Sequence, residues 1–306
     1  MTTKTQTMGH FRSPEGERAY KKSYAAAMKS LPEPTRTLDI TTSYGTIRVY
    51  EFTNNQNANS TPIVLLPGRS SGVPMWAKNL AGLARQRTVY ALDALGDAGL
   101  DVQTKALKNS ADQAAWLEET FAQIGLTKIH LVGHSFGGWL AANYAVRFPR
   151  RIVTLSLLEP VFVFQGLHWQ FYIKSIPASL PFLPKSWRDK MLKSISGSAE
   201  LDLSDPIARM IADATEHYAI KVPTPSRISV AQLEGLSMPV YGAMAANSPL
   251  HNPDAAVALA QKHVKNVTIR SWPNATHSLP MEFPEQVDNE LLKFMSANET
   301  SQRSGE

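Results

Sequence analysis

The sequence predicts an α/β protein in which a mostly parallel sheet is covered by helices on both faces, with a helical cap inserted over one end of the sheet. Two observations predict this class. From about residue 62 to residue 296, short apolar runs rich in β-branched residues alternate with helical segments, as they do when helices join parallel strands. Residues 162–236 break this alternation with many aromatic residues and prolines, and they are too long for a simple connection.

The composition is that of a globular protein. The chain has 306 residues, of which 43% are hydrophobic, and its formal charge of +5 comes without a basic block. We therefore predict no nucleic-acid partner and no membrane partner. It contains no cysteine, which excludes thiolate metal sites and cysteine nucleophiles. The start lacks a signal-peptide core, and no run approaches the roughly 18 apolar residues that span a bilayer. We expect a cytoplasmic protein, and the sequence does not indicate its oligomeric state.

Residues 1–34 are predicted to form a polar tail and a lead-in helix. Ser13 followed by Pro14 is a helix start signal. The apolar face of this helix would consist of Tyr20, Tyr24, Met28 and Leu31. The segment "TLDITTSYGTIRVYEF" then reads as two strands around a turn at Tyr44-Gly45. The first dozen residues and the tail at 297–306 are polar, and we expect them to be disordered.

The predicted core comprises residues 35–161 and 237–296, and the cap comprises residues 162–236. The core strands are expected at Pro62–Leu66, Thr88–Leu92, Ile129–Val132, Ile152–Leu158, Pro239–Met244 and Val267–Trp272. Two helix starts are marked between them. Ser110 with Gln113 resembles a capping box, and Asn252-Pro253-Asp254 supplies a cap, a first-turn proline and a first-turn carboxylate.

A serine lies at the junction of one predicted strand and the helix after it. In Gly133-x-Ser135-x-Gly137 the flanking glycines allow a tight, strained turn that lifts the serine above the edge of the sheet. The helix N-terminus, including the backbone N–H of Phe136, points at this side chain and suits a developing oxyanion. The pattern therefore favours a nucleophilic serine over a glycine-rich turn with an incidental one.

With these motifs, the chain resembles the α/β-hydrolase superfamily over nearly all of residues 35–296. The matching pieces are "PIVLLPGRSSG", "VYALDALGDAG", "HLVGHSFGGWLAANYAVRFPRRI", the Met238-Pro239 entry to a late strand, and "NATHSLPMEFPEQV". More narrowly, it is similar to bacterial carboxylesterases that carry a like lead-in helix. The resemblance implies the α/β-hydrolase fold and serine hydrolase chemistry, which needs no metal or organic cofactor.

A serine hydroxyl needs a base to take its proton and an acid to orient that base. The resemblance places the catalytic histidine in the loop before the last helix, which makes His277 the candidate. Three other histidines fit less well. His134 beside the serine should point elsewhere, His251 lies in a loop without a matching motif, and His263 falls within an amphipathic helix.

The acid is not where the family most often has it. That position follows the strand ending "VYGAMAANS", and here it is occupied by Ala245. Glu159 is the leading replacement, because it ends an apolar strand and some relatives, such as haloalkane dehalogenases and zearalenone-type lactone hydrolases, carry a glutamate after this strand. Asp254 is the alternative, although its first-turn position already explains it as a helix-dipole partner.

The second oxyanion donor is expected in the loop "PGRSSG". Here the family's usual His-Gly pair is Pro67-Gly68, so the resemblance assigns the role to the backbone N–H of Arg69, together with that of Phe136. A backbone donor tolerates such a change of side chain.

These residues predict hydrolysis of a carboxylic ester or lactone through an acyl-enzyme on Ser135. The substrate is expected to be a small molecule that is apolar and fairly bulky, because aromatic side chains are abundant in the cap. Candidate substrate-binding residues are Phe162, Phe164, Trp169 and Trp187. Two alternatives stay open: cofactor-free perhydrolysis or carbon–carbon bond hydrolysis, and a non-catalytic ligand-binding relative.

Overall fold

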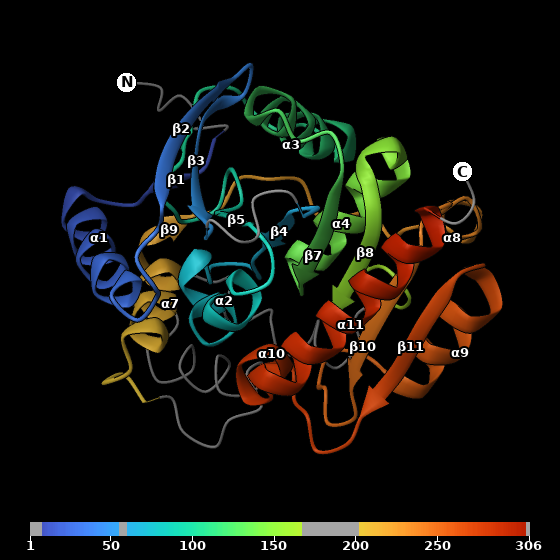
Figure 1. Ribbon diagram of the computed structural model, residues 1–306. Coiled ribbons are helices and arrows are strands. Elements are labelled where there is room, and N and C mark those ends of the chain that lie inside the picture. The colour runs from blue at the N-terminus through green and yellow to red at the C-terminus, as the bar shows by residue number, and fades with distance from the viewer. Residues whose placement is uncertain (1–7, 55–59, 167–201, 304–306) are drawn as a thin grey trace.

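The computed structural model describes residues 8–54, 60–166 and 202–303, and in these ranges nine strands form one sheet (Figure 1). The strand order is β11–β10–β8–β7–β4–β5–β3–β2, with β6 also paired to β3. The strands are β2 (Arg36–Thr42), β3 (Gly45–Phe52), β4 (Ile63–Leu66), β5 (Val89–Leu92), β6 (Val102–Gln103), β7 (Ile129–His134), β8 (Ile152–Leu158), β10 (Val240–Ala245) and β11 (Val267–Trp272).

Most of the sheet, from β11 at one edge to β5, is parallel, as the sequence predicts. Strands β11, β10, β8, β7, β4 and β5 pair in parallel, while β2 and β3 pair antiparallel. All six predicted core strands are present, with ends shifted by at most two residues. The predicted turn lies one residue earlier, at Ser43–Tyr44, and Gly45 opens β3 with a φ of 146° that favours glycine.

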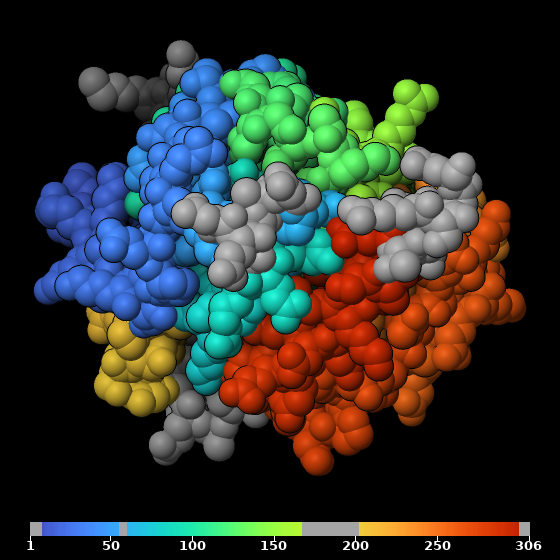
Figure 2. Space-filling model, viewed as in Figure 1, coloured from blue at the N-terminus to red at the C-terminus, as the bar shows by residue number. Residues whose placement is uncertain are grey.

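Helices cover both faces of the sheet. Apolar side chains alternate along the strands, so that Leu66 packs in one core cluster and Leu65 in the other. The first cluster is covered by α3 (Ser110–Ile124), α4 (Phe136–Arg147), α8 (Val230–Glu234) and α9 (Pro253–His263). The second is covered by η1 (Val73–Trp76), α2 (Ala77–Ala84), α10 (Leu279–Glu282) and α11 (Pro284–Arg303). In Figure 2 the cyan atoms around α2 and the red atoms around α10 and α11 adjoin on the visible face.

The lead-in helix α1 (Pro14–Met28) packs against α7 (Pro206–His217), a part of the predicted cap. Tyr20 and Tyr24 lie buried in the cluster that these two helices share with Ala98. Just before α1, β1 (His10–Phe11) pairs with β9 (Tyr218–Ala219). The prediction of disorder is therefore wrong at β1, where the backbone groups find partners in a distant segment. Residues 167–201, the middle of the predicted cap, lie outside the described residues.

Among the described helices, side chains cap the starts of α1, α3, α7, α8 and α9. Ser13 accepts from the backbone N–H of Gly16 at 3.0 Å, and Asn252 accepts from Ala255 at 3.0 Å, as predicted. The predicted cap of α3 is wrong by one residue. Asn109 accepts from the backbone N–H of Asp112 at 2.9 Å, whereas Ser110 is the first helical residue.

The predicted disorder of the tail is also wrong for residues 297–303, because α11 continues to Arg303, whereas residues 304–306 lie outside the described residues. Glu299 pairs with Arg87 at 2.8 Å and contacts His130 at 3.0 Å. Arg87 and His130 are both buried, so a carboxylate from the tail compensates a cation that burial would otherwise disfavour. In the part of the chain that the structure covers, no helix is both long and apolar enough to cross a membrane.

Candidate active site

Ser135 occupies the sharp turn between β7 and α4. Its backbone has φ 55° and ψ −117°, a strained conformation for a residue with a side chain. The flanking glycines have no room for a methyl group: a Cβ on Gly137 would lie 2.2 Å from the Leu66 oxygen, and one on Gly133 would lie 2.2 Å from the Gly137 oxygen. The two glycines therefore allow the close packing that this turn requires.

The serine hydroxyl is at one end of a hydrogen-bonded chain of three side chains. It lies 2.9 Å from Nε2 of His277, and Nδ1 of His277 lies 3.1 Å from Oε2 of Glu159. With Glu159 ionised, His277 donates through Nδ1, which leaves its Nε2 lone pair facing the hydroxyl. The structure thus brings together Ser135, His277 and Glu159, the three residues that the sequence analysis proposes for catalysis.

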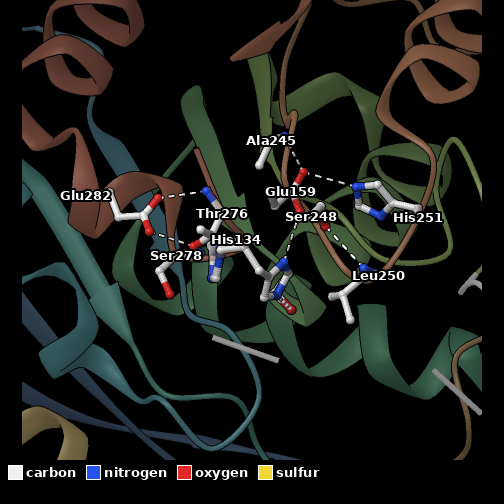
Figure 3. Close-up of polar contacts among 11 residues, drawn as sticks. His134, Glu159, Ala245, Ser248, Leu250, His251, Thr276, Ser278 and Glu282 are labelled. Carbon is white, nitrogen blue, oxygen red and sulfur yellow. Dashed lines mark hydrogen bonds and ion pairs between the residues drawn. The ribbon is translucent and has the colours of Figure 1, made fainter. Parts of the chain in front are cut away.

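Glu159 is fully buried at the end of β8, with a φ of 49°. Besides His277, two donors reach its Oε1: the backbone N–H of Ala245 at 2.6 Å and Nε2 of His251 at 3.0 Å (Figure 3). Burial would raise the pKa of Glu159, but the hydrogen bonds from His251 and His277 outweigh it and hold the pKa well below its usual value. The carboxylate is therefore ionised at neutral pH.

The alternative acid, Asp254, is not part of this cluster. It is exposed in the first turn of α9 and makes no contact with His277 among the described residues. Ala245, at the position where the resemblance leads one to expect an acid, supplies its backbone N–H to Glu159 instead.

The loop that carries His277 is held by hydrogen bonds to α10 and to the loop after β10. Glu282 in α10 accepts from the backbone N–H of Thr276 at 2.8 Å and from the Thr276 hydroxyl at 2.6 Å (Figure 3). The Ala275 oxygen accepts from the backbone N–H of Asn247 at 3.0 Å, which ties this loop to the one after β10. These contacts limit how far the imidazole can move from Ser135.

His134 supports the same loop and is not a base for Ser135. Its Nε2 lies 2.7 Å from the backbone oxygen of His277 and donates to it. Its Nδ1 is buried without a hydrogen-bond partner in the described ranges. Burial and the neighbouring His277 lower the pKa of His134 to about 3, so this ring is neutral.

The backbone N–H groups of Arg69, in the loop after β4, and Phe136, the first residue of α4, make no hydrogen bond within the described residues. They are the two donors that the sequence analysis proposes for an oxyanion. The Arg69 guanidinium lies 3.9 Å from the centre of the Phe136 ring. Burial lowers the pKa of this guanidinium, and the nearby Asp97 carboxylate acts in the opposite direction.

The predicted substrate-binding aromatics are only partly placed. Phe164 is fully buried and packs in the first core cluster, and its assignment to the substrate stays a prediction. Phe162 is half-buried against the same cluster, with a φ of 57°. Trp169 and Trp187 lie outside the described residues.

The sequence analysis missed the contact of His251 with Glu159. The available signal was its place in the loop after β10, which ends at the same edge of the sheet as β8. In residues 8–54, 60–166 and 202–303, no group of three or more His, Cys, Asp or Glu side chains is arranged to hold a metal ion. His251 and His277 each have a ring nitrogen within hydrogen-bond distance of the Glu159 carboxylate.

The chain is similar along most of its length to bacterial carboxylesterases. It is 23% identical to a protein described as the uncharacterized carboxylesterase nap of Bacillus subtilis, covering 91% of this chain and 92% of the relative. It is 26% identical to carboxylesterase YbfK of the same organism, covering 76% and 79% of the two chains.

Solved structures share the fold. The crystal structure of carboxylesterase CesB (YbfK) from Bacillus subtilis matches with a TM-score of 0.84 at 22% identity, covering 92% of this chain and 98% of that one. Naproxen esterase from Bacillus subtilis matches with a TM-score of 0.83 at 21% identity, covering 92% and 99%. The model of the alpha/beta hydrolase family matches residues 63–290, which include Ser135, Glu159 and His277. The chain therefore belongs to the alpha/beta hydrolase family.

Proposed function

We propose that this protein is a serine hydrolase that cleaves a carboxylic ester or lactone through an acyl-enzyme on Ser135. The observation that carries the proposal is the hydrogen-bonded chain from the Ser135 hydroxyl through His277 to the buried Glu159 carboxylate. Three residues distant in sequence meet in the order that acyl transfer requires. The similarity to two Bacillus carboxylesterases supports the same class of reaction.

In the first half of the reaction, Oγ of Ser135 attacks the carbonyl carbon while Nε2 of His277 takes the hydroxyl proton. The carbonyl oxygen becomes an oxyanion, which the backbone N–H groups of Arg69 and Phe136 stabilise. Glu159 holds His277 in the required tautomer and stabilises its protonated form. The imidazolium then gives its proton to the leaving alkoxide oxygen as the carbon–oxygen bond breaks, which leaves an acyl-enzyme.

In the second half, water takes the place of the alcohol. His277 accepts a proton from the water as it attacks the acyl carbon, and the same two N–H groups hold the second oxyanion. Collapse of this intermediate returns the proton to Ser135 and releases the carboxylic acid. For a lactone, the alcohol and the acid stay on one product molecule. We propose an apolar, fairly bulky substrate, since the sequence of the cap segment, residues 162–236, is rich in aromatic residues.

Ester turnover in three variants tests the assignment. We expect Ser135→Ala to abolish both turnover and labelling by a fluorophosphonate probe. Glu159→Gln should lower kcat at least about a hundredfold, because the amide no longer holds the imidazole in its tautomer. Asp254→Asn, the matched control, removes an exposed carboxylate and should change kcat less than about twofold. Measurements use p-nitrophenyl esters and a panel of lactones.

Other outcomes would point elsewhere. Labelling of Ser135→Ala equal to that of wild type would contradict the nucleophile and favour a ligand-binding relative. A greater loss in Asp254→Asn than in Glu159→Gln would contradict the assigned acid. Peracid formation from acetate and hydrogen peroxide that exceeds ester hydrolysis would favour a perhydrolase, whereas cleavage of a diketone without ester turnover would favour a carbon–carbon bond hydrolase.

A further inference from the structure

A second histidine contacts the Glu159 carboxylate on the oxygen that does not face His277. Nε2 of His251 lies 3.0 Å from Oε1, whereas Nδ1 of His277 lies 3.1 Å from Oε2. In Figure 3, Ala245 and His251 both approach Glu159, Ala245 from the last residue of β10 and His251 from the loop after it. Both partners are buried: Glu159 is 0% exposed and His251 is 5% exposed. Removal of one partner of such a buried hydrogen bond destabilises the protein, because the other partner stays buried without it.

The position of Glu159 explains why a further donor matters. The acid expected from the resemblance would follow β10, whereas Glu159 follows β8. The Glu159 side chain has three rotatable bonds. Each free bond in a buried side chain must be fixed at an entropic cost. The N–H of Ala245 and the ring of His251 both come from the end of β10 and the loop after it, and both reach Oε1. They hold one oxygen in place, so that the other faces His277.

The loop itself places His251. The Ser248 hydroxyl accepts from the backbone N–H of Leu250 at 3.3 Å, and Leu250 is buried. Immediately after His251, Asn252 caps α9 and fixes where the helix begins. The ring is thus anchored from both sides along the chain, as a residue that orients a catalytic group needs to be.

We propose that His251 is a positioning residue, whose Nε2–H fixes the Glu159 carboxylate and limits how strongly that carboxylate attracts the His277 imidazolium. The proposal rests on the proposed function, since it concerns the same three side chains. His251 is not itself a catalytic residue, because among the described residues its ring makes no hydrogen bond to Ser135 or His277.

Removal of the donor has a predictable effect on pH dependence. Without the His251 hydrogen bond, more of the negative charge of Glu159 is available to the imidazolium, and Glu159 itself becomes easier to protonate. Either change raises the pH below which His277 no longer acts as the base. The titratable groups around the contact are Glu159, His277 and His134, and His134 is neutral in this range because burial lowers its pKa. The acid limb of the pH profile should therefore move upward.

The test compares His251→Leu, which has no donor, with His251→Gln, whose amide can donate to Oε1. His263→Gln is the matched control, because His263 contacts Glu234 at 2.9 Å and lies outside the site. We expect His251→Leu to lower kcat for p-nitrophenyl butyrate about tenfold or more with little change in KM. Its acid limb should move up by at least about half a pH unit. His251→Gln should recover most of both effects, and His263→Gln should match wild type.

Three results would overturn the proposal: unchanged kinetics in His251→Leu, an equal loss at every pH, or a loss in His251→Gln as large as in His251→Leu. A melting curve for each variant separates a folding defect from a local effect. If wild type turns over no ester, the proposed function fails by itself. The proposal about His251 is then tested by the pH profile of fluorophosphonate labelling of Ser135 and by the proton NMR signal of the His277 Nδ1–H, which should shift in His251→Leu but not in His263→Gln.

Discussion

Single residues at the turn around Ser135 combine a strained backbone with close packing. Ser135 itself has a positive φ, and the next glycine of the motif, Gly137, packs directly beneath the end of β4. A Cβ on Gly137 would lie 2.2 Å from the Leu66 oxygen and 2.5 Å from the Pro67 oxygen. Both atoms belong to the backbone, so neither can move without shifting the strand or the loop that carries Arg69.

Gly137→Ala tests this packing against helix propensity. Alanine in place of glycine within a helix is worth about 1 kcal/mol of stability by propensity alone. Overpacking against backbone costs about 1–3 kcal/mol or more, so we expect a net loss, accompanied by reduced ester turnover. Gly166→Ala is the control, because no atom of the described residues lies within 4 Å of its added Cβ. Urea unfolding and kcat measure both effects, and equal stability of the two variants would contradict the argument.

At the scale of elements, α2 and α11 pack together over one face of the sheet through a buried polar pair. Nδ2 of Asn79 donates to Oδ1 of Asp288 at 2.8 Å, and the two side chains are 0% and 5% exposed as residues. Burial raises the pKa of Asp288 to about 7, although the Asn79 hydrogen bond acts against this. The helix pair therefore holds a carboxyl group that is easier to bury when protonated.

Asp288→Asn should stabilise the protein above neutral pH. The folded pKa of Asp288 is raised, so the native state binds a proton that the unfolded chain releases, and stability is lost between about pH 4 and about pH 7. Asparagine keeps an acceptor for Asn79 without a titrating charge. We expect the variant to be more stable than wild type in urea at pH 8 and equal to it near pH 4. A loss of stability at pH 8 would show that the charge is favourable where it lies.

For the whole molecule, the features that could be predicted from the sequence are those that local residue patterns determine. The parallel strands and the turn at Ser135 follow from apolar runs and glycine spacing. Glu159 could be singled out because a charged residue ends an apolar strand. His251 could be placed at the same edge of the sheet as Glu159, because it follows β10, but its contact with Glu159 depends on the path of the loop between β10 and α9, which no local pattern determines. The order of the tail could not be predicted either, since Glu299 contacts Arg87 and His130, which are distant from it in the sequence.

Glu299→Gln tests how far this tail contributes to global stability. Burial would raise the pKa of Glu299, but hydrogen bonds from Arg87 and other partners lower it to about 2. Because the folded pKa is depressed, the stabilisation is present above the unfolded pKa near 4 and is lost as the pH falls toward 2. Arg87 is 5% exposed, so removal of its carboxylate leaves a buried cation without its partner. We expect a loss of about 2–4 kcal/mol at pH 7, smaller at pH 3.

The control is Glu285→Gln, which removes an exposed carboxylate from the first turn of the same helix and should cost less than about 1 kcal/mol. Urea unfolding of both variants at pH 7 and pH 3 gives the comparison. Ester turnover of the folded Glu299→Gln protein should equal that of wild type, because His130 lies near the start of β7, whereas Ser135 follows its end. Equal losses in the two variants would mean that the tail carboxylate acts only as a surface charge, and the last turns of α11 would then add little to the stability of the fold.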